Sequence, residues 1–410
     1  MHYGFYLPTR GQTTTPDDVD TLVQRGEAYG FHSVMIADHI VFPTDIQSRY
    51  PYTVSGAFPG HGDAMEQLTL MAFVAAKTTT LRLVTSVMIL PYRNPVLTAK
   101  MLATIDVLSR GRVTVGVGVG WLCEEFEALD APDFTRRGAV SNEYIQIFKT
   151  LWTQDPATFT GKFYQFQALH CLPHPIQQPH PPIWIGGHSP AALRRAARYG
   201  DGWHPVGANL AVPLRPHELE VALGDLKRLT EAAGRDPEAL TISYKAPLYD
   251  VSMTAERQAG LERRPFSGTT EQIVADIATY GRLGVSELIF DFQREPERKP
   301  RAHGAFRHRD QASSRDLGWS RACMLPYPLP LASPPYPNLP RQGKRSQIPL
   351  LQIECQTLLG EEFLSSSSHT SGMQMEEIHP LLYFIAYTGS LYALYVPGVQ
   401  VCPPFSRRSV

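Results

Sequence analysis

The chain has 410 residues, which exceeds the usual size of one domain, so its length predicts one large domain with an additional segment. Its 38 Lys and Arg balance 39 Asp and Glu, but residues 294–345 hold eleven basic and four acidic residues, which leaves residues 1–293 acidic. This distribution excludes a nucleic-acid-binding surface on the large domain, and five widely spaced cysteines without a Cys-x-x-Cys pair exclude a disulfide framework and a zinc ribbon.

Short apolar runs alternate with amphipathic stretches along residues 1–293, as is typical of alternating strands and helices. The predicted strands are 3–7, 33–37, 82–88, 112–117, 182–185, 203–206, 241–245 and 287–292. The predicted helices are 16–29, 65–77, 96–109, 135–152, 191–199, 216–233 and 270–283. Residues 159–166, with Gly161 and Lys162 at their centre, predict an inserted hairpin.

This alternation indicates a parallel sheet with right-handed crossovers, and eight such units close into a (β/α)8 barrel. A doubly wound open sheet is the alternative. Barrels of this kind carry their chemistry at the C-terminal ends of the strands, so the residues that follow each apolar run are the candidates for a site. These residues are Pro8, Asp38, His39, Ser86, Val87, 116–121 and 186–188.

The stretch 183–204 carries the clearest binding signal. Its strand ends at Gly186 and Gly187, and Ser189 is suited to be the N-cap of the helix that follows. A helix N-terminus behind a glycine turn offers free N–H groups and positive partial charge, which favours a bound phosphate. An ordinary strand-to-helix connection is the alternative, but the Gly-Asp-Gly-Trp sequence at 200–203, directly after the helix, favours a phosphate site.

Within this stretch, the run GGHSPAALRRAARYGDGW resembles the phosphate-binding segment of the bacterial luciferase-like monooxygenase superfamily. The resemblance is greatest to the branch of oxidoreductases that use the deazaflavin coenzyme F420, and it extends in order over residues 3–292. It implies a (β/α)8 barrel that binds coenzyme F420, with flavin mononucleotide (FMN) as the alternative cofactor. It also implies that Gly186, Gly187, His188 and Ser189 hold the cofactor.

Asp38 and His39 follow the second predicted strand. An imidazole titrates near neutral pH and suits proton transfer beside a redox ring, whereas a capping or core pair is the alternative interpretation. The resemblance implies that His39 lies at the face of the ring and takes part in proton or hydride chemistry, and that Asp38 orients it. It further implies a non-prolyl cis peptide between Ser86 and Val87, which forms a bulge against the middle ring of the cofactor; the alternative is an ordinary barrel strand.

The glycine-rich run 116–120 does not match a Rossmann fingerprint, because Trp121 interrupts the required spacing. Gly118 and Gly120 are instead expected to leave room for a flat cofactor ring. Resembling deazaflavin enzymes sometimes carry a catalytic glutamate directly after this run, but Trp121 occupies that position here. Neither Glu124 nor Glu125 is therefore assigned a catalytic role.

Two arginine pairs, at 136–137 and 194–195, are interpreted as a solvated helix face for at least one member of each pair. Contact with the acidic tail of coenzyme F420 is the alternative, and it favours F420 weakly over FMN. His170, His174 and His180 lie in a proline-rich loop without helical spacing, so no metal site is predicted.

The sequence beyond residue 293 departs from the barrel pattern. Residues 293–310 are basic and lack a helical apolar stripe, so the eighth helix is predicted to be missing. Seven of the seventeen residues at 324–340 are proline. The expected domains are a barrel at 1–293 and a basic, Pro-rich, low-complexity and largely disordered tail at 294–410, unrelated to the resembling family. Residues 381–401 are apolar but broken by polar residues and a proline, so no membrane span is expected.

The leading interpretation is an F420-dependent oxidoreductase that transfers a hydride between reduced deazaflavin and a small organic substrate. The alternatives are an FMN-dependent luciferase-like monooxygenase that uses O2, and a flavin- or deazaflavin-binding protein without turnover. A further hypothesis makes the tail an interaction segment for acidic partners. The first residues carry no secretory signal, so a cytoplasmic protein is expected, and a homodimer is left open.

Overall fold

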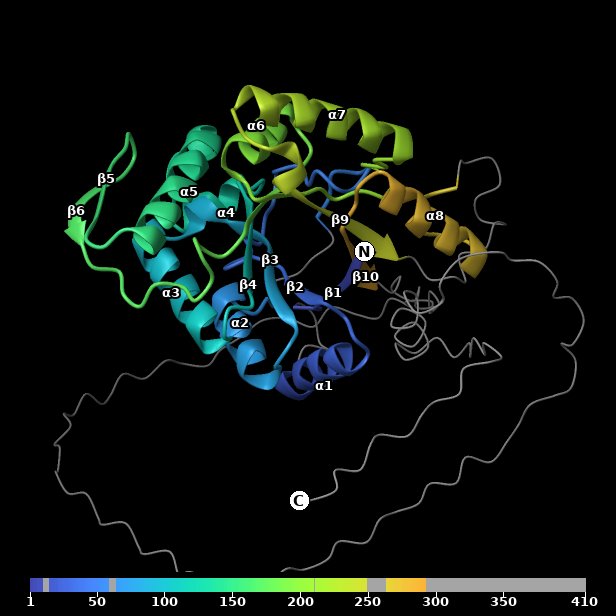
Figure 1. Cartoon of the computed structure of the whole chain (residues 1–410), viewed down its shortest axis with the longest axis horizontal. Helices are drawn as coiled ribbons and strands as arrows, with labels where there is room; N and C mark the ends of the chain where they lie inside the picture. Colours follow the sequence, from blue (N-terminus) through green and yellow to red (C-terminus); the bar gives the residue numbers. More distant parts are fainter. Residues whose placement is uncertain (10–14, 59–63, 210, 249–262, 293–410) are drawn as a thin grey trace, which may run out of the picture. The chain divides into compact units, whose positions relative to one another are not determined.

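The structure is a computed structural model that describes residues 1–9, 15–58, 64–209, 211–248 and 263–292. Eight parallel strands form a closed barrel in the order β1-β10-β9-β8-β7-β4-β3-β2 (Figure 1). Their bounds are β1 (His2–Tyr6), β2 (Ser33–Ile36), β3 (Arg82–Ile89), β4 (Val113–Gly118), β7 (Ile183–Gly186), β8 (Gly202–His204), β9 (Thr241–Leu248) and β10 (Glu287–Phe292). The predicted (β/α)8 barrel is confirmed, and the open sheet is excluded.

Helices connect successive barrel strands and cover the outside of the barrel. The longer ones are α1 (Pro16–Ala28), α2 (Gln67–Lys77), α3 (Pro95–Leu108), α5 (Arg137–Thr153), α6 (Pro190–Tyr199), α7 (Pro216–Ala232) and α8 (Thr270–Arg282). All seven predicted helices are confirmed, with ends that differ by at most two residues. The short helices are α4 (Cys123–Ala128), η1 (Leu90–Tyr92), η2 (Phe134–Arg136) and η3 (Pro237–Ala239). The sequence did not predict α4.

The predicted hairpin is also present and projects away from the barrel strands, as Figure 1 shows. It consists of β5 (Ala157–Thr160) and β6 (Gln165–Leu169), which pair antiparallel. The carboxylate of Glu143 in α5 accepts hydrogen bonds from the backbone N–H groups of Lys162, Phe163 and Tyr164 at distances of 2.6–2.9 Å. This contact fastens the hairpin to the outer helical layer.

Buried aliphatic and aromatic side chains fill the space between the strands and the helices. All four residues of β2 are buried, as expected for a parallel strand covered on both faces. A smaller cluster of Met35, Val84, Trp184 and Ile289 comes from β2, β3, β7 and β10. Among the described residues, no helix is both long enough and apolar enough to cross a bilayer. The predicted tail at 294–410 and the predicted absence of an eighth helix after β10 lie outside the described residues.

Candidate functional site

The predicted site residues lie on strands that neighbour one another in the barrel. They end or follow β2, β3, β4 and β7 and are Asp38, His39, Ser86, Val87, Gly118, Gly120 and 186–189. These four strands are consecutive in the barrel order and pair in parallel. Their C-terminal ends therefore meet on one edge of the barrel, which we call the C-terminal rim, and the structure brings His39 and Gly187 to the same end of the fold.

His39 is held by a glutamate that the sequence did not assign. Its Nδ1 lies 2.8 Å from Oε2 of Glu125, which is fully buried in α4. The same carboxylate accepts hydrogen bonds from the backbone N–H of Ile40 at 2.8 Å, that of Val41 at 3.3 Å and the hydroxyl of Tyr92 at 2.9 Å. The other three contacts of this carboxylate are all donated to it, so Nδ1 of His39 is assigned as its fourth donor, which leaves Nε2 for a ligand.

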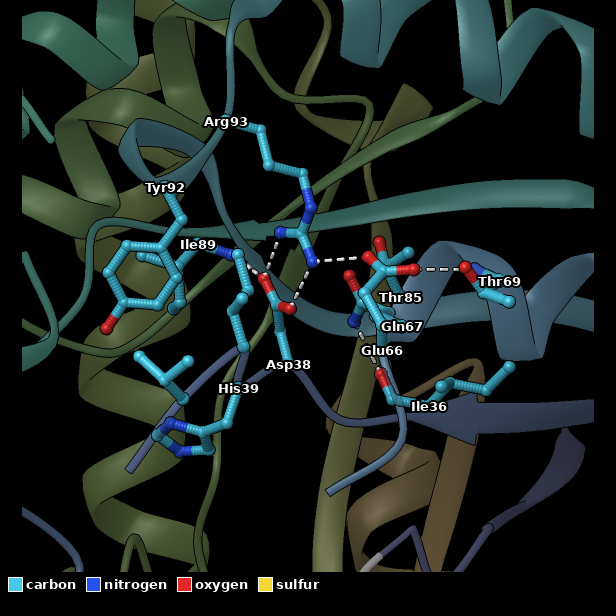
Figure 2. Close-up of polar contacts among 12 residues, drawn as sticks. Ile36, Asp38, His39, Glu66, Gln67, Thr69, Thr85, Ile89, Tyr92 and Arg93 are labelled. Atoms are coloured by element: carbon cyan, nitrogen blue, oxygen red, sulfur yellow. Dashed lines mark hydrogen bonds and ion pairs between the residues drawn. The ribbon is translucent and has the colours of Figure 1, made fainter. Parts of the chain in front are cut away.

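Asp38 does not orient His39, which corrects the expectation from the sequence. Its carboxylate accepts a bidentate pair of hydrogen bonds from the guanidinium of Arg93, both 2.8 Å long. It also accepts a hydrogen bond from the backbone N–H of Ile89 at 2.8 Å. Figure 2 shows the Asp38 carboxylate directed at Arg93 and the His39 ring directed away from it. Asp38 thus ties the end of β2 to the end of β3, and it positions the segment on which His39 lies.

Arg93 extends this contact to α2. Its guanidinium also lies 2.7 Å from Oε1 of Glu66, whose other carboxylate oxygen accepts a hydrogen bond from the N–H of Thr69 in the first turn of α2 (Figure 2). Burial works against the charge of Arg93, but Asp38 and Glu66 outweigh it and hold the pKa of Arg93 above its ordinary value. The guanidinium of Arg93 therefore stays charged throughout the pH range in which proteins are stable.

Aromatic side chains cover His39. Its ring centroid lies 4.6 Å from that of Phe42, 5.3 Å from that of Phe58 and 6.3 Å from that of Trp121. Tyr50 packs on Phe58 and Trp121 with centroids 5.0 Å apart in both cases, and Tyr52 lies 5.5 Å from Tyr50. We call Phe42, Tyr50, Tyr52, Phe58 and Trp121 the aromatic wall. It leaves the His39 side chain only 10% exposed, which keeps the imidazole in a dry environment.

The expected cis peptide between Ser86 and Val87 is present. It coincides with a shift in the pairing of β3 with β4 between Thr85 and Met88, so the expected bulge in β3 is confirmed. Above and below this point the two strands pair in regular parallel register.

A chain of polar groups supports the bulge from inside the barrel. The hydroxyl of Ser86 lies 2.8 Å from Nε2 of His204, whose Nδ1 lies 3.0 Å from the hydroxyl of Ser243. The hydroxyl of Tyr6 donates to the carbonyl oxygen of Ser86. Burial lowers the pKa of His204 to about 4, with a smaller contribution from the charge of Lys245, so this imidazole is neutral near pH 7. The bulge is thus held by hydrogen bonds of uncharged groups.

The glycines of β4 and β7 make room for Val87. A Cβ atom added to Gly118 would lie 2.6 Å from Cγ2 of Val87, and one added to Gly186 would lie 2.7 Å from its Cγ1. At Gly120, which has φ +87°, an added Cβ would lie 2.6 Å from the ring of Phe126. On the Cβ side of Gly118 and Gly120 the space is thus filled by protein side chains, and the expected contact of these glycines with a cofactor ring stays a prediction.

The turn before α6 has the geometry that the sequence predicts. Gly187 adopts φ +88°, in the left-handed region that favours glycine, and its carbonyl oxygen accepts a hydrogen bond from Nε1 of Trp203 at 2.7 Å. Ser189 is the N-cap of α6, and its hydroxyl accepts from the N–H of Ala192 at 3.2 Å. The Trp203 contact joins the glycine turn to β8 and fixes the direction in which α6 begins.

His188 lies between the glycine turn and α6 and is partly buried. Its Nδ1 is buried and has no hydrogen-bond partner among the described residues. Burial lowers the pKa of His188, which favours the neutral ring. An unpaired ring nitrogen beside a helix N-terminus fits an anionic group that accepts a hydrogen bond from its N–H, such as the phosphate of a flavin or deazaflavin cofactor.

Two of the four arginines considered from the sequence hold the protein's own backbone. The guanidinium of Arg137 donates to the carbonyl oxygens of Gly120 at 3.2 Å and Phe134 at 2.8 Å. That of Arg195 donates to Asn142 Oδ1 at 2.6 Å and to the carbonyl of Gly138 at 3.1 Å. Within the described ranges, no group of His, Cys, Asp and Glu side chains has the arrangement of a metal site.

Sequence reasoning missed Glu125 because it missed α4. A signal for this helix was present in the spacing of Leu122, Phe126 and Leu129, which are apolar at i, i+4 and i+7. Glu125 follows Leu122 by three residues and therefore shares its inward face. His204 was missed as a site residue for another reason, since nothing in the sequence shows which face of β8 points into the barrel.

Comparisons with known proteins agree with this architecture. The family model described as "Luciferase-like monooxygenase" matches residues 1–316, and so extends beyond residue 293. The crystal structure of the monooxygenase RslO1 from Streptomyces bottropensis has a TM-score of 0.56 and 24% sequence identity, covering 71% of this chain and 91% of that one. At this identity the likeness shows the shared fold.

Three relatives illustrate the range of the family. An uncharacterized protein of Mycobacterium tuberculosis is 36% identical over 255 residues, which are 62% of this chain and 83% of that protein. The FMNH(2)-dependent dimethylsulfone monooxygenase of Pseudomonas putida is 38% identical over 152 residues, 37% of this chain and 41% of that enzyme. The F420-dependent glucose-6-phosphate dehydrogenase of Amycolatopsis mediterranei is 32% identical over 191 residues, 46% of this chain and 53% of that enzyme. The family match over residues 1–316, in agreement with the closed parallel barrel, shows that the chain belongs to the luciferase-like monooxygenase family, whose members similar to it include an FMNH(2)-dependent and an F420-dependent enzyme.

Proposed function

We propose that the protein is an oxidoreductase that binds coenzyme F420 at the C-terminal rim and transfers a hydride between the reduced deazaflavin and a small organic substrate. The observation that carries the proposal is the buried His39–Glu125 pair on the rim that also bears the glycine turn 186–189. The relative from Amycolatopsis mediterranei, which is F420-dependent by its name, supports the choice of cofactor. When bound, the deazaflavin supplies the carbon that gives or takes the hydride.

In this proposal His39 moves the proton that accompanies the hydride. A carbonyl substrate that gains a hydride on carbon needs a proton on oxygen, and an alcohol that loses a hydride must release that proton. Nε2 of His39 serves both directions, because Glu125 keeps Nδ1 protonated and the ring in one orientation. The buried carboxylate also stabilises the imidazolium when Nε2 carries the proton. Asp38 contributes by positioning the end of β2 through Arg93.

The binding residues are assigned by the same reasoning. Gly186, Gly187, His188 and Ser189 are proposed to hold the phosphate, since the turn presents the N-terminus of α6 and the unpaired Nδ1 of His188. The cofactor ring is proposed to lie against the bulge formed by Ser86 and Val87. Gly118 and Gly120 are proposed to contribute to cofactor binding indirectly, since they leave room for the side chains of Val87 and Phe126. The aromatic wall excludes water from His39.

FMN-dependent monooxygenation with O2 is the second candidate, and one observation favours it. Arg137 and Arg195 donate to groups of the protein itself. This removes two of the four arginines that were candidates for contact with the acidic tail of F420, and leaves Arg136 and Arg194. FMN has one phosphate and no such tail. The name of the Pseudomonas putida relative also fits this reading.

Cofactor titrations separate the two candidates. The purified full-length protein is titrated with F420 and with FMN, each oxidised and reduced, and oxygen consumption is recorded with the reduced forms. We expect binding of F420 and no oxygen uptake in its presence. Oxygen uptake with reduced FMN, together with no binding of F420, replaces the proposal with the monooxygenase. Binding of a cofactor without reduction or oxidation by any of a panel of alcohols and carbonyl compounds indicates a binding protein.

The role of His39 is tested by His39→Ala. We expect the rate of hydride transfer to fall by about 10²–10⁴, the usual contribution of a general acid or base, with the dissociation constant of the cofactor changed by less than about threefold. His170→Ala is the matched control, because His170 is 71% exposed and pairs with Asp155 near the hairpin. Equal rates for His39→Ala and the control remove His39 from the mechanism.

A further inference from the structure

The C-terminal rim carries an ammonium group that the proposed proton transfer does not use. Lys245 lies in β9, and its Nζ sits 3.5 Å from the centroid of the Tyr6 ring in β1. The nearest carboxylate oxygen among the described residues is Oδ2 of Asp291 in β10, at 3.2 Å. The side chain of Lys245 is 15% exposed. A cation is thus held at the rim, between three neighbouring strands, and is still open to a ligand.

Lys245 remains charged in this position. Burial works against the ammonium, but Tyr6, Asp291 and Tyr50 outweigh it and hold the pKa of Lys245 above its ordinary value. The distance of 3.2 Å to Asp291 exceeds the roughly 2.7–2.9 Å that is usual between an ammonium and a carboxylate in close contact. An ammonium has three donors, so one loose carboxylate partner leaves capacity for another acceptor.

The surroundings of Lys245 connect it with both parts of the candidate site. Tyr6, on whose ring Nζ lies, donates its hydroxyl to the carbonyl of Ser86 in the bulge. Tyr52 of the aromatic wall feels the charge of Lys245. Burial raises the pKa of Tyr52 to about 12, and Lys245 acts in the opposite direction. The ring contacts from Tyr52 through Tyr50 and Phe58 lead to His39. Ring contacts thus lead from His39 to Tyr52, and the charge of Lys245 acts on Tyr52.

We propose that Lys245 binds a carboxylate of the substrate, and that the substrate is a small, planar, mostly apolar monocarboxylate whose body lies against the aromatic wall. Aromatic side chains match a planar apolar body, and the ammonium offsets its charge. Asp291 already balances the charge of Lys245, so the ammonium can bind one further carboxylate only through the donors that Asp291 leaves free, and the two charges of a phosphate monoester fit less well. This inference deepens the proposed function, since it assigns the substrate class of the same site.

The probe for this site is benzoate, with benzamide as its neutral isostere. Dissociation constants are measured by ligand-observed NMR titration of the full-length protein, alone and with saturating F420 or FMN. We expect benzoate to bind at least about tenfold more tightly than benzamide, a difference of about 1.4 kcal/mol. Phenyl phosphate is the comparison for charge and should bind more weakly than benzoate. Equal affinity for benzoate and benzamide, or no binding of benzoate in any of the three states, overturns the proposal.

Variants link the preference to Lys245. Lys245→Met should reduce benzoate affinity to that of benzamide, while Asp291→Asn should tighten benzoate binding because it removes a competing negative charge. Lys227→Met, at an exposed position of α7, is the matched control and should leave both affinities unchanged. If Lys245→Met fails to fold, the Asp291→Asn result and the wild-type preference still decide the matter. An unchanged benzoate preference in a folded Lys245→Met protein contradicts the assignment. Failure of F420 binding with a retained benzoate preference refutes only the proposed cofactor.

Discussion

Glu125 is a buried carboxylate, and its contacts explain why burial is tolerated. Removing a charge from water costs several kcal/mol unless hydrogen bonds replace those of the solvent. Here two backbone N–H groups, the Tyr92 hydroxyl and the imidazole of His39 take the place of water. Burial and the charge of Glu125 raise the pKa of Tyr92, so its hydroxyl stays protonated and remains a donor. The acid, the phenol and the imidazole therefore form one unit.

Replacing Glu125 by Gln should break this unit. The amide nitrogen of Gln would face groups that donate hydrogen bonds, so at least one of the four contacts is lost and one buried donor is left without an acceptor. We expect Glu125→Gln to lower the free energy of unfolding by about 2 kcal/mol or more, measured by urea denaturation. Glu127→Gln, on the exposed face of the same helix, should change it by less than about 0.5 kcal/mol. Equal stability of the two variants contradicts the description of Glu125 as the organising acid.

At the scale of elements, the sequence predicts the barrel well because each strand and helix carries its own local signals. The helix α6 has Ser189 as N-cap and Gly200 at its end, and α3 starts at Asn94 and Pro95 in the same way. The helix α4 has neither signal, since Leu122 at its N-cap makes no side-chain cap. It spans six residues and is held by contacts with distant residues, such as that of the Cys123 N–H with Ser48 at 3.1 Å.

The site was harder to predict than the elements that carry it. The resemblance to a family pointed to His39, the bulge and the glycine turn. It implied that Asp38, the residue before His39, orients the imidazole, whereas the structure shows Glu125 in contact with it. Adjacent residues at a strand end point in different directions, and only the fold shows that one meets Arg93 and the other Glu125. Lys245 and His204 are strand residues whose inward direction depends on barrel register, which a single sequence does not contain.

The bulge of β3 depends on the small size of the glycines opposite it. Gly186→Ala should push its methyl group against Val87, so we expect a loss of about 1–3 kcal/mol in unfolding free energy and weaker cofactor binding. Val87→Ala in the same protein removes the methyl groups in conflict and should restore part of both. The double-mutant cycle therefore gives a coupling energy above about 0.5 kcal/mol, from urea denaturation of the four proteins.

A glycine in open surroundings provides the control for this cycle. Gly224 lies within α7, and an added Cβ would meet no atom within 4 Å. Gly224→Ala should stabilise the protein by roughly 0.5–1 kcal/mol, because alanine favours a helix over glycine, and it should not couple to Val87→Ala. Additive effects of Gly186→Ala and Val87→Ala would contradict the packing that we describe.

At the scale of the whole molecule, a second buried acid lies at the N-terminal end of the barrel and contacts a residue of another strand. Glu287 begins β10, and its carboxyl accepts a hydrogen bond from Ser33 at the start of β2. The strand between them is β1, where Gly4 leaves the space that the Ser33 side chain occupies. Burial raises the pKa of Glu287 to about 7, although Ser33 and the charge of Arg82 pull it down. At this end of the barrel, burial therefore favours the protonated, neutral form of Glu287.

This preference makes the stability of the barrel depend on pH. The folded-state pKa of Glu287, about 7, lies above its value of 4.5 in the unfolded chain, so its contribution is full below pH 4.5 and is lost as the pH rises to about 7. The loss amounts to roughly 3 kcal/mol at most. Burial lowers the pKa values of His32 and His204 to about 4, so their contribution has the opposite sign and is lost as the pH falls from 6.5 to 4.

The difference between two proteins isolates the effect of Glu287. Glu287→Gln keeps the size of the side chain and its hydrogen bond to Ser33 but carries no titrating proton, whereas His32 and His204 are the same in both proteins. We expect the variant to gain stability relative to the wild type as the pH rises from 5 to 8, by roughly 2–3 kcal/mol in urea denaturation. A constant difference in stability across this range would mean that the Glu287 carboxyl is already ionised at pH 5. The pKa of Glu287 would then not be raised by burial.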